Sequence, residues 1–434
     1  MSQPTPDGEG AGGRRQVEAG LARTPSEGLG LRKRRDALPW DVARELAHAA
    51  GRPGRAVSRG LGEAEGGVLA TPLVSAGNVP PVDRAAMDGY AVCGAGPWRV
   101  VGRVGVSCAA GVVLADGEAC GIVTGAAVPS GASSVMRSED AVVVGDRLHG
   151  PSEDGRHIRR AGEECAAGEQ LLPAGVVVDP VVLGLAAAVG LNRLSVIPPP
   201  RVAALVTGDE LVHRGPSGPG RVRDAIGPML PGLIRRAGAP GAPVNPVPGA
   251  SGSPVRHLPD SRGELVRALS DTEADLILVS GSSAAGPADH LRPALAALGA
   301  EVIVDGVACR PGHPQALAQL ADGRLVLGLP GNPFAALVAF LTLGVATISR
   351  MRGLPLPTLT RAPVPGGLAC HPTSTRLVPV RLTRQGAVPV GHGGSAMLRG
   401  AAAADALAVV DPGPSEAIAA RLLPLDPGAR PWTV

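Results

Sequence analysis

Short runs of apolar residues alternate with segments of helical periodicity between residue 201 and about residue 350. The helical segments span 263–269 and 288–298, and the apolar runs span 202–206, 276–279, 302–304 and 325–327. A run that is apolar at every position suits a strand covered on both faces, and its alternation with helices indicates βαβ units. We therefore predict a doubly wound parallel sheet within an α/β domain at residues 201–352.

The regions on either side of this α/β domain have a different pattern. Residues 66–150 and 353–434 contain short apolar runs broken by Gly and Pro, which predicts a small, mainly β domain in each region. Residues 1–36 are rich in Gly, Arg, Glu, Pro and Ser, so we expect a disordered tail. A helix is predicted to begin at Pro39 and to end at Gly51. The fold class is thus a multi-domain α/β protein.

The composition excludes several classes of function. Two Phe, one Tyr and three Trp offer few stacking platforms for single-stranded nucleic acid. A net charge of +3 over 434 residues favours neither a polyanion nor a membrane surface as partner. The six cysteines form no C-x-x-C pair, and the chain begins without an apolar leader. We expect a cytoplasmic protein that binds no nucleic acid and no membrane.

Small and acidic residues follow three of the predicted strands. The sequence T-G-D-E begins at Thr207, S-G begins at Ser280 with Asp289 nearby, and P-G-N-P begins at Pro330. Ligands of an open parallel sheet bind beyond the carboxyl ends of its strands, where backbone amides and helix starts favour phosphate. Carboxylates in such a crevice suit a magnesium ion that bridges phosphate oxygens. A nucleotide-like or diphosphate ligand with Mg²⁺ is therefore expected.

Five motifs in this order resemble those of one protein family. They are A-M-D-G-Y-A-V at 86–92, T-G-A at 124–126, I-R-R-A-G-E-E at 158–164, T-G-D-E-L at 207–211 and L-P-G-N-P at 329–333. The family is that of the molybdopterin molybdenumtransferases, which includes MoeA and the gephyrin E-domain. The chain resembles a divergent, actinobacterial-like member over roughly residues 38–430.

This resemblance implies an elongated homodimer. Its α/β domain would be MogA-like and would bind molybdopterin, while residues 37–65 and 151–200 would form an elongated linker and dimerisation domain. The α/β domain of one subunit would face the domain at 66–150 of the other, so that active sites are shared between subunits.

The resemblance also implies the chemistry. Molybdate and adenylylated molybdopterin would be the substrates, Mg²⁺ the cofactor, and AMP would leave when molybdenum is inserted. The catalytic residues would be Asp88, Thr124, Glu210 and Asp289, and the metal ligands Asp209, Glu210 and Asp289. The residues that bind substrate or cofactor would be Arg159, Glu164, Thr207, Gly208, Asp224, Ser280, Gly281, Arg310, His313, Pro330, Gly331, Asn332 and Pro333.

Two basic residues replace lysines of the family pattern. The chain has R-P-G-H-P at 310–314 where the family usually has K-P-G-K-P. Arginine offers a planar, permanently charged fork, and histidine offers a charge that depends on pH. We hypothesise that Arg310 and His313 hold molybdate, a tetrahedral dianion.

Other departures keep alternative functions open. The family's D-S-N becomes Asp224-Ala225-Ile226, and the second glycine of its S-G-G loop becomes Ser282, whose Cβ would strain the loop if φ is positive. One alternative is a weak or inactive paralogue that binds and assembles molybdopterin without releasing AMP. Another is a different enzyme on the same α/β domain, such as an adenylyltransferase or a nucleotide hydrolase.

Overall fold

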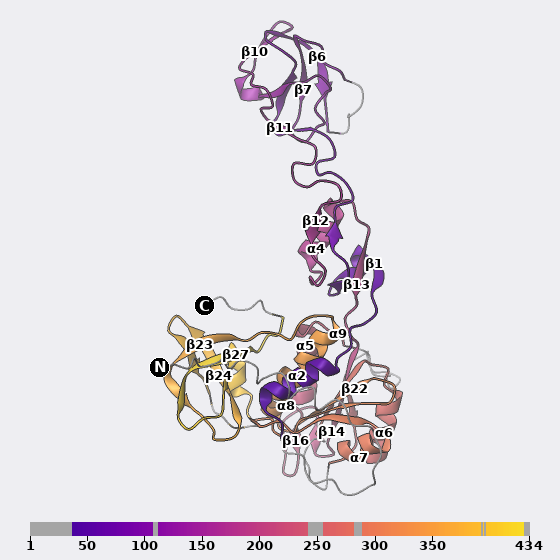
Figure 1. The fold of residues 1–434 in the computed structure, drawn as a ribbon, viewed down its shortest axis with the longest axis vertical. Coiled ribbons are helices and arrows are strands. Elements are labelled where there is room, and N and C mark those ends of the chain that lie inside the picture. Colours follow the sequence, from indigo (N-terminus) through magenta and orange to yellow (C-terminus); the bar gives the residue numbers. More distant parts are fainter. Residues whose placement is uncertain are drawn as a thin grey trace, which may run out of the picture. The chain divides into compact units, whose positions relative to one another are not determined.

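The computed structural model describes residues 37–106, 112–241, 255–281, 289–391, 394 and 396–428 (Figure 1). The tail expected at 1–36 and Ser282, with the rest of its loop, lie outside the described residues.

The α/β domain is built on a six-stranded sheet in the order β17-β14-β18-β22-β21-β19. The first four strands are parallel, but β21 is antiparallel to both of its neighbours, β22 and β19. The predicted doubly wound parallel sheet is therefore confirmed for these four strands, and the antiparallel strands at one edge make the sheet mixed. The cause is a tight return at Gly323, where φ is +90°, which turns β21 directly back into β22. The strands are β14 (Val202–Thr207), β17 (Val255–Leu258), β18 (Leu276–Ser280), β19 (Glu301–Asp305), β21 (Ala316–Gln319) and β22 (Leu325–Leu329).

Helices cover both faces of this sheet, as the doubly wound prediction requires. Successive residues of a strand point to opposite faces. Ala204 and Leu278 accordingly belong to one apolar cluster, whereas Leu205 and Ile277 belong to the other. The first cluster includes α5 (Ile226–Arg236), α8 (Pro333–Ala339), the π-helix η2 (Phe340–Gly344) and α9 (Val345–Met351), and the second includes α6 (Arg262–Asp271) and α7 (Leu291–Ala297).

The first described helix, α2 (Trp40–Ala50), also packs on the α/β domain. Trp40 is 1% exposed, and its indole N–H donates to the Thr342 hydroxyl at 3.0 Å. The Thr347 hydroxyl donates to the Ala47 carbonyl at 3.2 Å. The sequence reasoning grouped this helix with residues 151–200, but these contacts lie with the core of the α/β domain.

The continuous helical stretch Pro333–Met351 is long and apolar enough to cross a membrane. It is 89% buried inside the protein, with Phe334 and Phe340 completely buried among core residues. This stretch is therefore a core helix of the fold.

The region before residue 150 is mainly β, as predicted. Its largest sheet has the order β8-β5-β7-β6-β10-β9. The strands are β5 (Gly89–Val92), β6 (Trp98–Val104), β7 (Glu118–Ile122), β8 (Ser134–Arg137), β9 (Val142–Val144) and β10 (Arg147–His149), with the 3₁₀ helix η1 (Ser138–Asp140) after β8.

Smaller elements connect this sheet to the α/β domain along the chain. They pair as β1-β13-β2, β11-β4 and β12-β3, whereas the short pair β15-β16 lies within the α/β domain, after β14. Their bounds are β1 (Val57–Gly60), α3 (Leu61–Ala64), β2 (Val68–Leu69), β3 (Leu73–Val74), β4 (Arg84–Ala85), β11 (Ile158–Arg159), β12 (Gln170–Leu172), α4 (Pro180–Ala188), β13 (Arg193–Ile197), β15 (Leu211–Val212) and β16 (Val222–Arg223).

A second β-rich region follows Leu354, again as predicted. Its sheet has the order β20-β24-β26-β27-β23, with β25 paired to β24. The strand β20 comes from the α/β segment of the chain, so the two regions share backbone hydrogen bonds. The elements are β20 (Cys309–Arg310), β23 (Thr360–Ala369), β24 (Thr375–Thr383), β25 (Gly386–Pro389), α10 (Arg399–Ala402), β26 (Ala406–Val410) and β27 (Glu416–Pro424).

Candidate functional site

The structure brings together the loops that follow β14, β18 and β22. The buried Thr207 hydroxyl donates to the Ser280 carbonyl at 3.1 Å, which ties the ends of β14 and β18. Gly281 has φ +90°, and a Cβ there would lie 2.4 Å from the Thr207 carbonyl oxygen. A Cβ on Gly331 would lie 3.8 Å from the Gly281 Cα, so these small loops border one another. The residues at the carboxyl ends of these three parallel strands therefore lie together, where the crevice is predicted.

Two exposed carboxylates follow Gly208 at this edge of the sheet. The Asp209 amide donates to an Asp260 carboxylate oxygen and the Asp260 amide donates to an Asp209 carboxylate oxygen, each at 3.2 Å. The Arg221 guanidinium donates to the Asp209 carbonyl at 2.7 Å. Asp209 and Glu210 are both exposed, so their carboxylates are open to a ligand.

Asp289, the third proposed metal ligand, is engaged within the protein. Its carboxylate is 4% exposed; Oδ1 accepts from the Leu291 amide at the start of α7, and Oδ2 accepts from Arg292 Nη1 at 2.7 Å. Arg292 also pairs with Asp305, and both carboxylates raise its pKa against the opposing effect of burial. Asp289 thus caps the start of α7, while Arg292 joins α7 to Asp305 at the end of β19.

The three acidic residues proposed as metal ligands do not form one group. Among the described residues, only His213, Asp224 and His257 form a trio of potential ligand atoms that lie within 4.8 Å of one another. Asp209, Glu210 and Asp289 are therefore not assembled as a three-carboxylate metal site in this structure.

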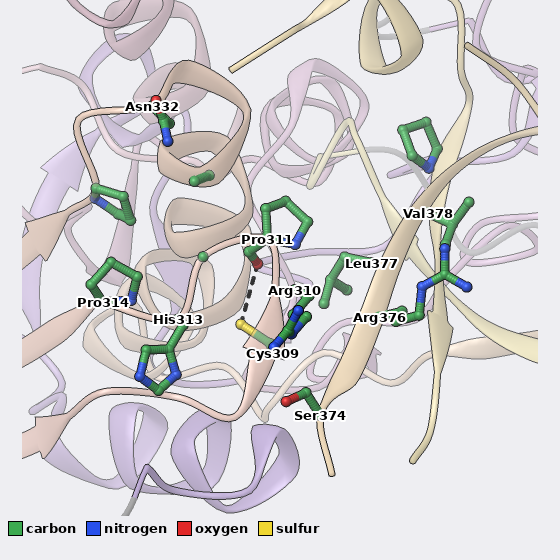
Figure 2. A pocket seen from close by; sticks show the side chains of 14 residues that line it. Cys309, Arg310, Pro311, His313, Pro314, Asn332, Ser374, Arg376, Leu377 and Val378 are labelled. Carbon is green, nitrogen blue, oxygen red and sulfur yellow. Dashed lines mark hydrogen bonds between the residues drawn. The ribbon is translucent and has the colours of Figure 1, made fainter. Parts of the chain in front are cut away.

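A pocket of about 720 Å³ lies between the R-P-G-H-P loop, the start of α8 and β24 (Figure 2). Arg310, His313, Pro330 and Asn332, all predicted site residues, line it. Arg376 of β24 lines it as well and was missed by the sequence reasoning. The lining residues are Cys309, Arg310, Pro311, Gly312, His313, Pro314, Pro330, Asn332, Ala335, Ser374, Arg376, Leu377, Val378 and Pro379.

The two arginines of this pocket are register partners in neighbouring parallel strands. Arg310 of β20 lies opposite Arg376 of β24. Arg310 is exposed, and the Arg376 guanidinium donates to the Ala369 carbonyl. Register partners share one face of a sheet, so two permanent positive charges are presented from adjacent strands. Such a pair suits a compact oxyanion.

Two further pocket residues are His313 and Asn332. His313 is exposed, with Nδ1 3.0 Å from the Val307 carbonyl oxygen, which orients the ring. Asn332 precedes α8, and Pro333 takes the first helical position, where a missing amide proton is tolerated. Cys309 lines the pocket but is buried; burial raises the pKa of its thiol to about 12, although a hydrogen bond from Gln315 opposes that shift.

Asp88 and Thr124 meet in the N-terminal β region. One Asp88 carboxylate oxygen accepts from the Thr124 amide at 2.6 Å and from the Thr124 hydroxyl at 2.8 Å. These two hydrogen bonds hold the pKa of the Asp88 carboxyl below its usual range. At Gly89, a Cβ would lie 1.9 Å from the Met136 carbonyl oxygen, so only glycine fits after Asp88. The motif thus fixes an ionised, exposed carboxylate.

The strand β4 connects three of the motifs. Ala85 accepts a hydrogen bond from the Gly125 amide, and Arg84 Nη1 donates to the Gly125 carbonyl at 2.6 Å. Arg159 lies opposite Arg84 in the β4–β11 ladder and is exposed. Glu164 is also exposed, and its amide donates to the Val79 carbonyl. The A-M-D-G-Y-A-V, T-G-A and I-R-R-A-G-E-E motifs therefore share one scaffold.

The carboxylate of Asp224 lies beside two histidines that sequence reasoning missed. Asp224 is 6% exposed and accepts from the Ile226 and Gly227 amides at the start of α5. Burial opposes its ionisation, but the hydrogen bonds from His257 and from these amides outweigh burial and lower the pKa of the carboxyl. His213 and His257 stand in no motif with Asp224, because they lie 11 residues before it and 33 residues after it.

Comparison with known proteins identifies the family. Three family models match the chain: the MoeA N-terminal region (domains I and II) at 38–190, a probable molybdopterin binding domain at 203–350, and the MoeA C-terminal region (domain IV) at 361–419.

Individual relatives agree with these models. The Molybdopterin molybdenumtransferase 2 of Mycobacterium tuberculosis (strain H37Rv) is 35% identical over 323 residues, which cover 70% of this chain and 77% of the relative. A molybdopterin molybdenumtransferase of Staphylococcus aureus (strain MRSA252) is 27% identical over 286 residues, which cover 63% of this chain and 66% of the relative.

A solved structure extends the similarity to the whole fold. The crystal structure of a molybdopterin biosynthesis MoeA protein from Pyrococcus horikosii matches with a TM-score of 0.73 and 26% identity, covering 90% of this chain and 99% of that one. The five motifs lie within the regions that the first two family models match, at 38–190 and 203–350. The chain belongs to the MoeA family of molybdopterin molybdenumtransferases.

Proposed function

We propose that this protein is a molybdopterin molybdenumtransferase that inserts molybdenum from molybdate into adenylylated molybdopterin and releases AMP. The family membership supports the activity class, and the pocket beside the crevice supports this form of the reaction. The observation that carries the proposal is the register pairing of Arg310 with Arg376 at the pocket wall.

Molybdate would bind between these arginines. The ion is a tetrahedral dianion. Two guanidinium groups on adjacent strands supply permanent positive charge and several N–H donors. His313 lines the same pocket, and its ring is oriented by the Val307 carbonyl. Histidine would add a third donor whose charge falls as the pH rises.

The adenylylated pterin would occupy the crevice at the ends of β14, β18 and β22. Backbone amides at Gly281 and Gly331 can approach a diphosphate because neither residue carries a side chain. Asp209 and Glu210 are exposed oxygen donors, and Mg²⁺ commonly uses one or two carboxylates together with substrate phosphates. These two residues therefore fit a magnesium site, and the ion would neutralise the phosphoanhydride oxygens as AMP leaves.

We assign Asp289 a positioning role within this site. Both of its carboxylate oxygens are engaged by α7 and Arg292, so the direct ligands of Mg²⁺ would be Asp209 and Glu210. Asp289 would hold the start of α7 in place through the Leu291 amide and Arg292.

Asp88 and Thr124 would complete the site of the partner subunit in a homodimer. Asp88 is an exposed carboxylate whose hydrogen bonds favour its charged form. It would therefore orient a hydrogen-bond donor of the substrate or the leaving AMP. Arg159 and Glu164 lie on segments tied to the same scaffold and would contact the same substrate.

The test of this proposal compares Arg376→Gln with Arg361→Gln in an assay of molybdate-dependent AMP release. Arg361 is an exposed arginine of β23 in the same sheet and does not line the pocket, so it is a matched control. We expect Arg376→Gln to raise the KM for molybdate at least about tenfold, as for the loss of one charged hydrogen bond. An unchanged KM for molybdate in Arg376→Gln would show that molybdate does not bind in this pocket.

A further inference from the structure

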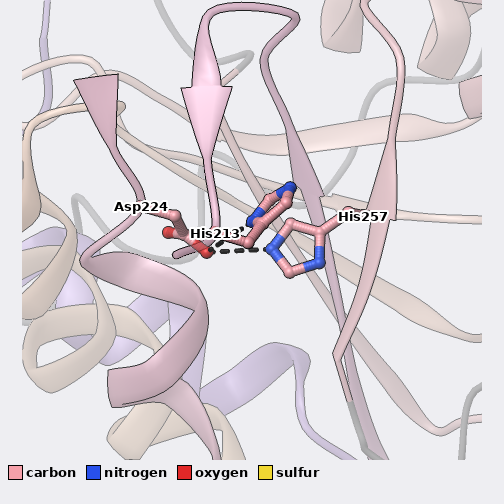
Figure 3. Close-up of side chains that lie close together, drawn as sticks. All are labelled: His213, Asp224 and His257. Carbon is pink, nitrogen blue, oxygen red and sulfur yellow. Dashed lines mark hydrogen bonds and ion pairs between the residues drawn. The ribbon is translucent and has the colours of Figure 1, made fainter. Parts of the chain in front are cut away.

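We propose that His213, Asp224 and His257 form a binding site for a late first-row divalent metal ion of the zinc class (Figure 3). One ligand atom from each residue lies within 4.8 Å of the other two. This site is separate from the magnesium site proposed above and does not depend on the proposed enzymatic activity.

The donor set selects the metal. Two imidazole nitrogens and one carboxylate oxygen suit Zn²⁺ and its neighbours, whereas Mg²⁺ prefers oxygen ligands and water. Three protein ligands leave a fourth tetrahedral position for water or another ligand.

The distances require only small side-chain movements. Asp224 Oδ2 lies 2.8 Å from His257 Nε2 and 3.8 Å from His213 Nδ1. Ligand atoms around a tetrahedral zinc ion, each about 2.0–2.2 Å from it, lie about 3.4 Å apart. The two observed separations lie on either side of that value.

The two oxygens of the Asp224 carboxylate have different partners. Oδ1 accepts from the Ile226 and Gly227 amides at 2.9 Å each, while Oδ2 faces the two histidines. A ligating carboxylate that is held by hydrogen bonds to its other oxygen is pre-oriented for metal. The Asp224 side chain is 4% exposed, whereas those of His213 and His257 are 50% and 38% exposed, so an ion can enter from solvent.

The backbone leaves space for this cluster. A Cβ on Gly227 would lie 2.3 Å from Asp224 Oδ2 and 3.2 Å from His257 Nε2. The first turn of α5 therefore accommodates the ligand atoms only because residue 227 is glycine.

A bound ion would connect separate parts of the α/β domain. His213 follows β15, Asp224 precedes α5, and His257 belongs to β17 at the edge of the main sheet. The rings of His213 and His257 lie 3.9 Å apart at their centroids. A metal held by both rings and Asp224 would fix β17 against the start of α5.

Zinc titration of the untagged, metal-free full-length protein tests the proposal. Competition with a chromophoric chelator should give one site per chain, and Co²⁺ should produce the absorption of a tetrahedral complex. His257→Gln, which can still hydrogen-bond to Asp224, should weaken zinc binding at least about 100-fold, since it removes a direct ligand. His149→Gln is the control, because His149 is an exposed histidine of β10 in another sheet.

Two results would overturn the metal site. One is the absence of stoichiometric zinc binding by the wild-type protein, and the other is equal zinc affinity in wild type and His257→Gln. Gly227→Ala gives a second check, because its methyl group would displace the ligand atoms and should also abolish binding; circular dichroism verifies that each variant folds. Zinc binding is measured without substrate, so failure of AMP release would leave this result unaffected.

Discussion

The side chain and the backbone of Thr124 both donate to the same oxygen of Asp88, at 2.8 and 2.6 Å. The two residues are 36 positions apart, and each belongs to a different motif. Hydrogen bonds to a carboxylate favour its charged form, so this contact keeps Asp88 ionised. The geometry explains why the two motifs occur together in one chain.

Replacing Thr124 with Val should shift the acid limb of the pH–rate profile to higher pH. The variant loses the hydroxyl donor but keeps the amide donor, so the pKa of Asp88 rises only part of the way towards its usual value. The measurement is kcat/KM for AMP release against pH. Thr124→Ser, which retains a hydroxyl, should leave the limb unchanged. A shift of the acid limb to lower pH in Thr124→Val would contradict the proposed role.

Replacing Asp289 with Asn should lower both stability and AMP release. Arg292 would lose one of its two carboxylate partners, and we expect about 1–3 kcal/mol less free energy of unfolding. Arg292→Met should cost at least as much stability, because it breaks the ion pairs with both Asp289 and Asp305. Denaturation in urea measures both variants.

The dependence of AMP release on Mg²⁺ separates positioning from direct ligation. Asp209→Asn should raise the Mg²⁺ concentration needed for half-maximal rate more than Asp289→Asn does. The reverse order would identify Asp289, rather than Asp209, as the direct ligand.

Substitutions at Trp40 and Thr342 should have coupled effects on the free energy of unfolding. Trp40→Phe removes the donor of a buried hydrogen bond, and Thr342→Val removes its acceptor, so each should cost about 1–3 kcal/mol. The double variant should lose less than the sum of the single losses, by about 0.5–3 kcal/mol. Urea unfolding followed by circular dichroism gives the double-mutant cycle. Strictly additive losses would show that α2 is not held to η2 by this hydrogen bond.

Cys309 should resist alkylation although it lines the pocket. With a thiol pKa of about 12, roughly one molecule in ten thousand carries the thiolate at pH 8. Cys93 and Cys370 are half-buried and should react with iodoacetamide first. Peptide mass spectrometry of labelled protein checks the order. Early labelling of Cys309 in folded protein would show that the pocket lowers its pKa.

The sequence predicted those features that depend on local patterns. Continuous apolar runs identified β14, β18 and β22, and two of the small residues after them, Gly281 and Gly331, lie together as expected. The antiparallel strand β21 was missed, because four residues of the sequence A-L-A-Q carry no directional signal. Its direction follows from the return at Gly323.

Contacts between distant segments were the least accessible to sequence reasoning. Arg376 becomes a pocket residue only because β24 pairs with β20, and His257 reaches Asp224 only because β17 lies beside β14. The ion pair between Asp289 and Arg292 could have been predicted from the sequence, since the two residues are three positions apart at a helix start.

The most direct test of the central claim is AMP release from adenylylated molybdopterin by the purified protein, with Mg²⁺ present and molybdate either added or omitted. We predict release well above the protein-free rate only when molybdate is present, and its loss in an Arg310→Gln, Arg376→Gln double variant. Tight pterin binding without molybdate-dependent AMP release would contradict the insertase function and would favour a molybdopterin-binding assembly protein.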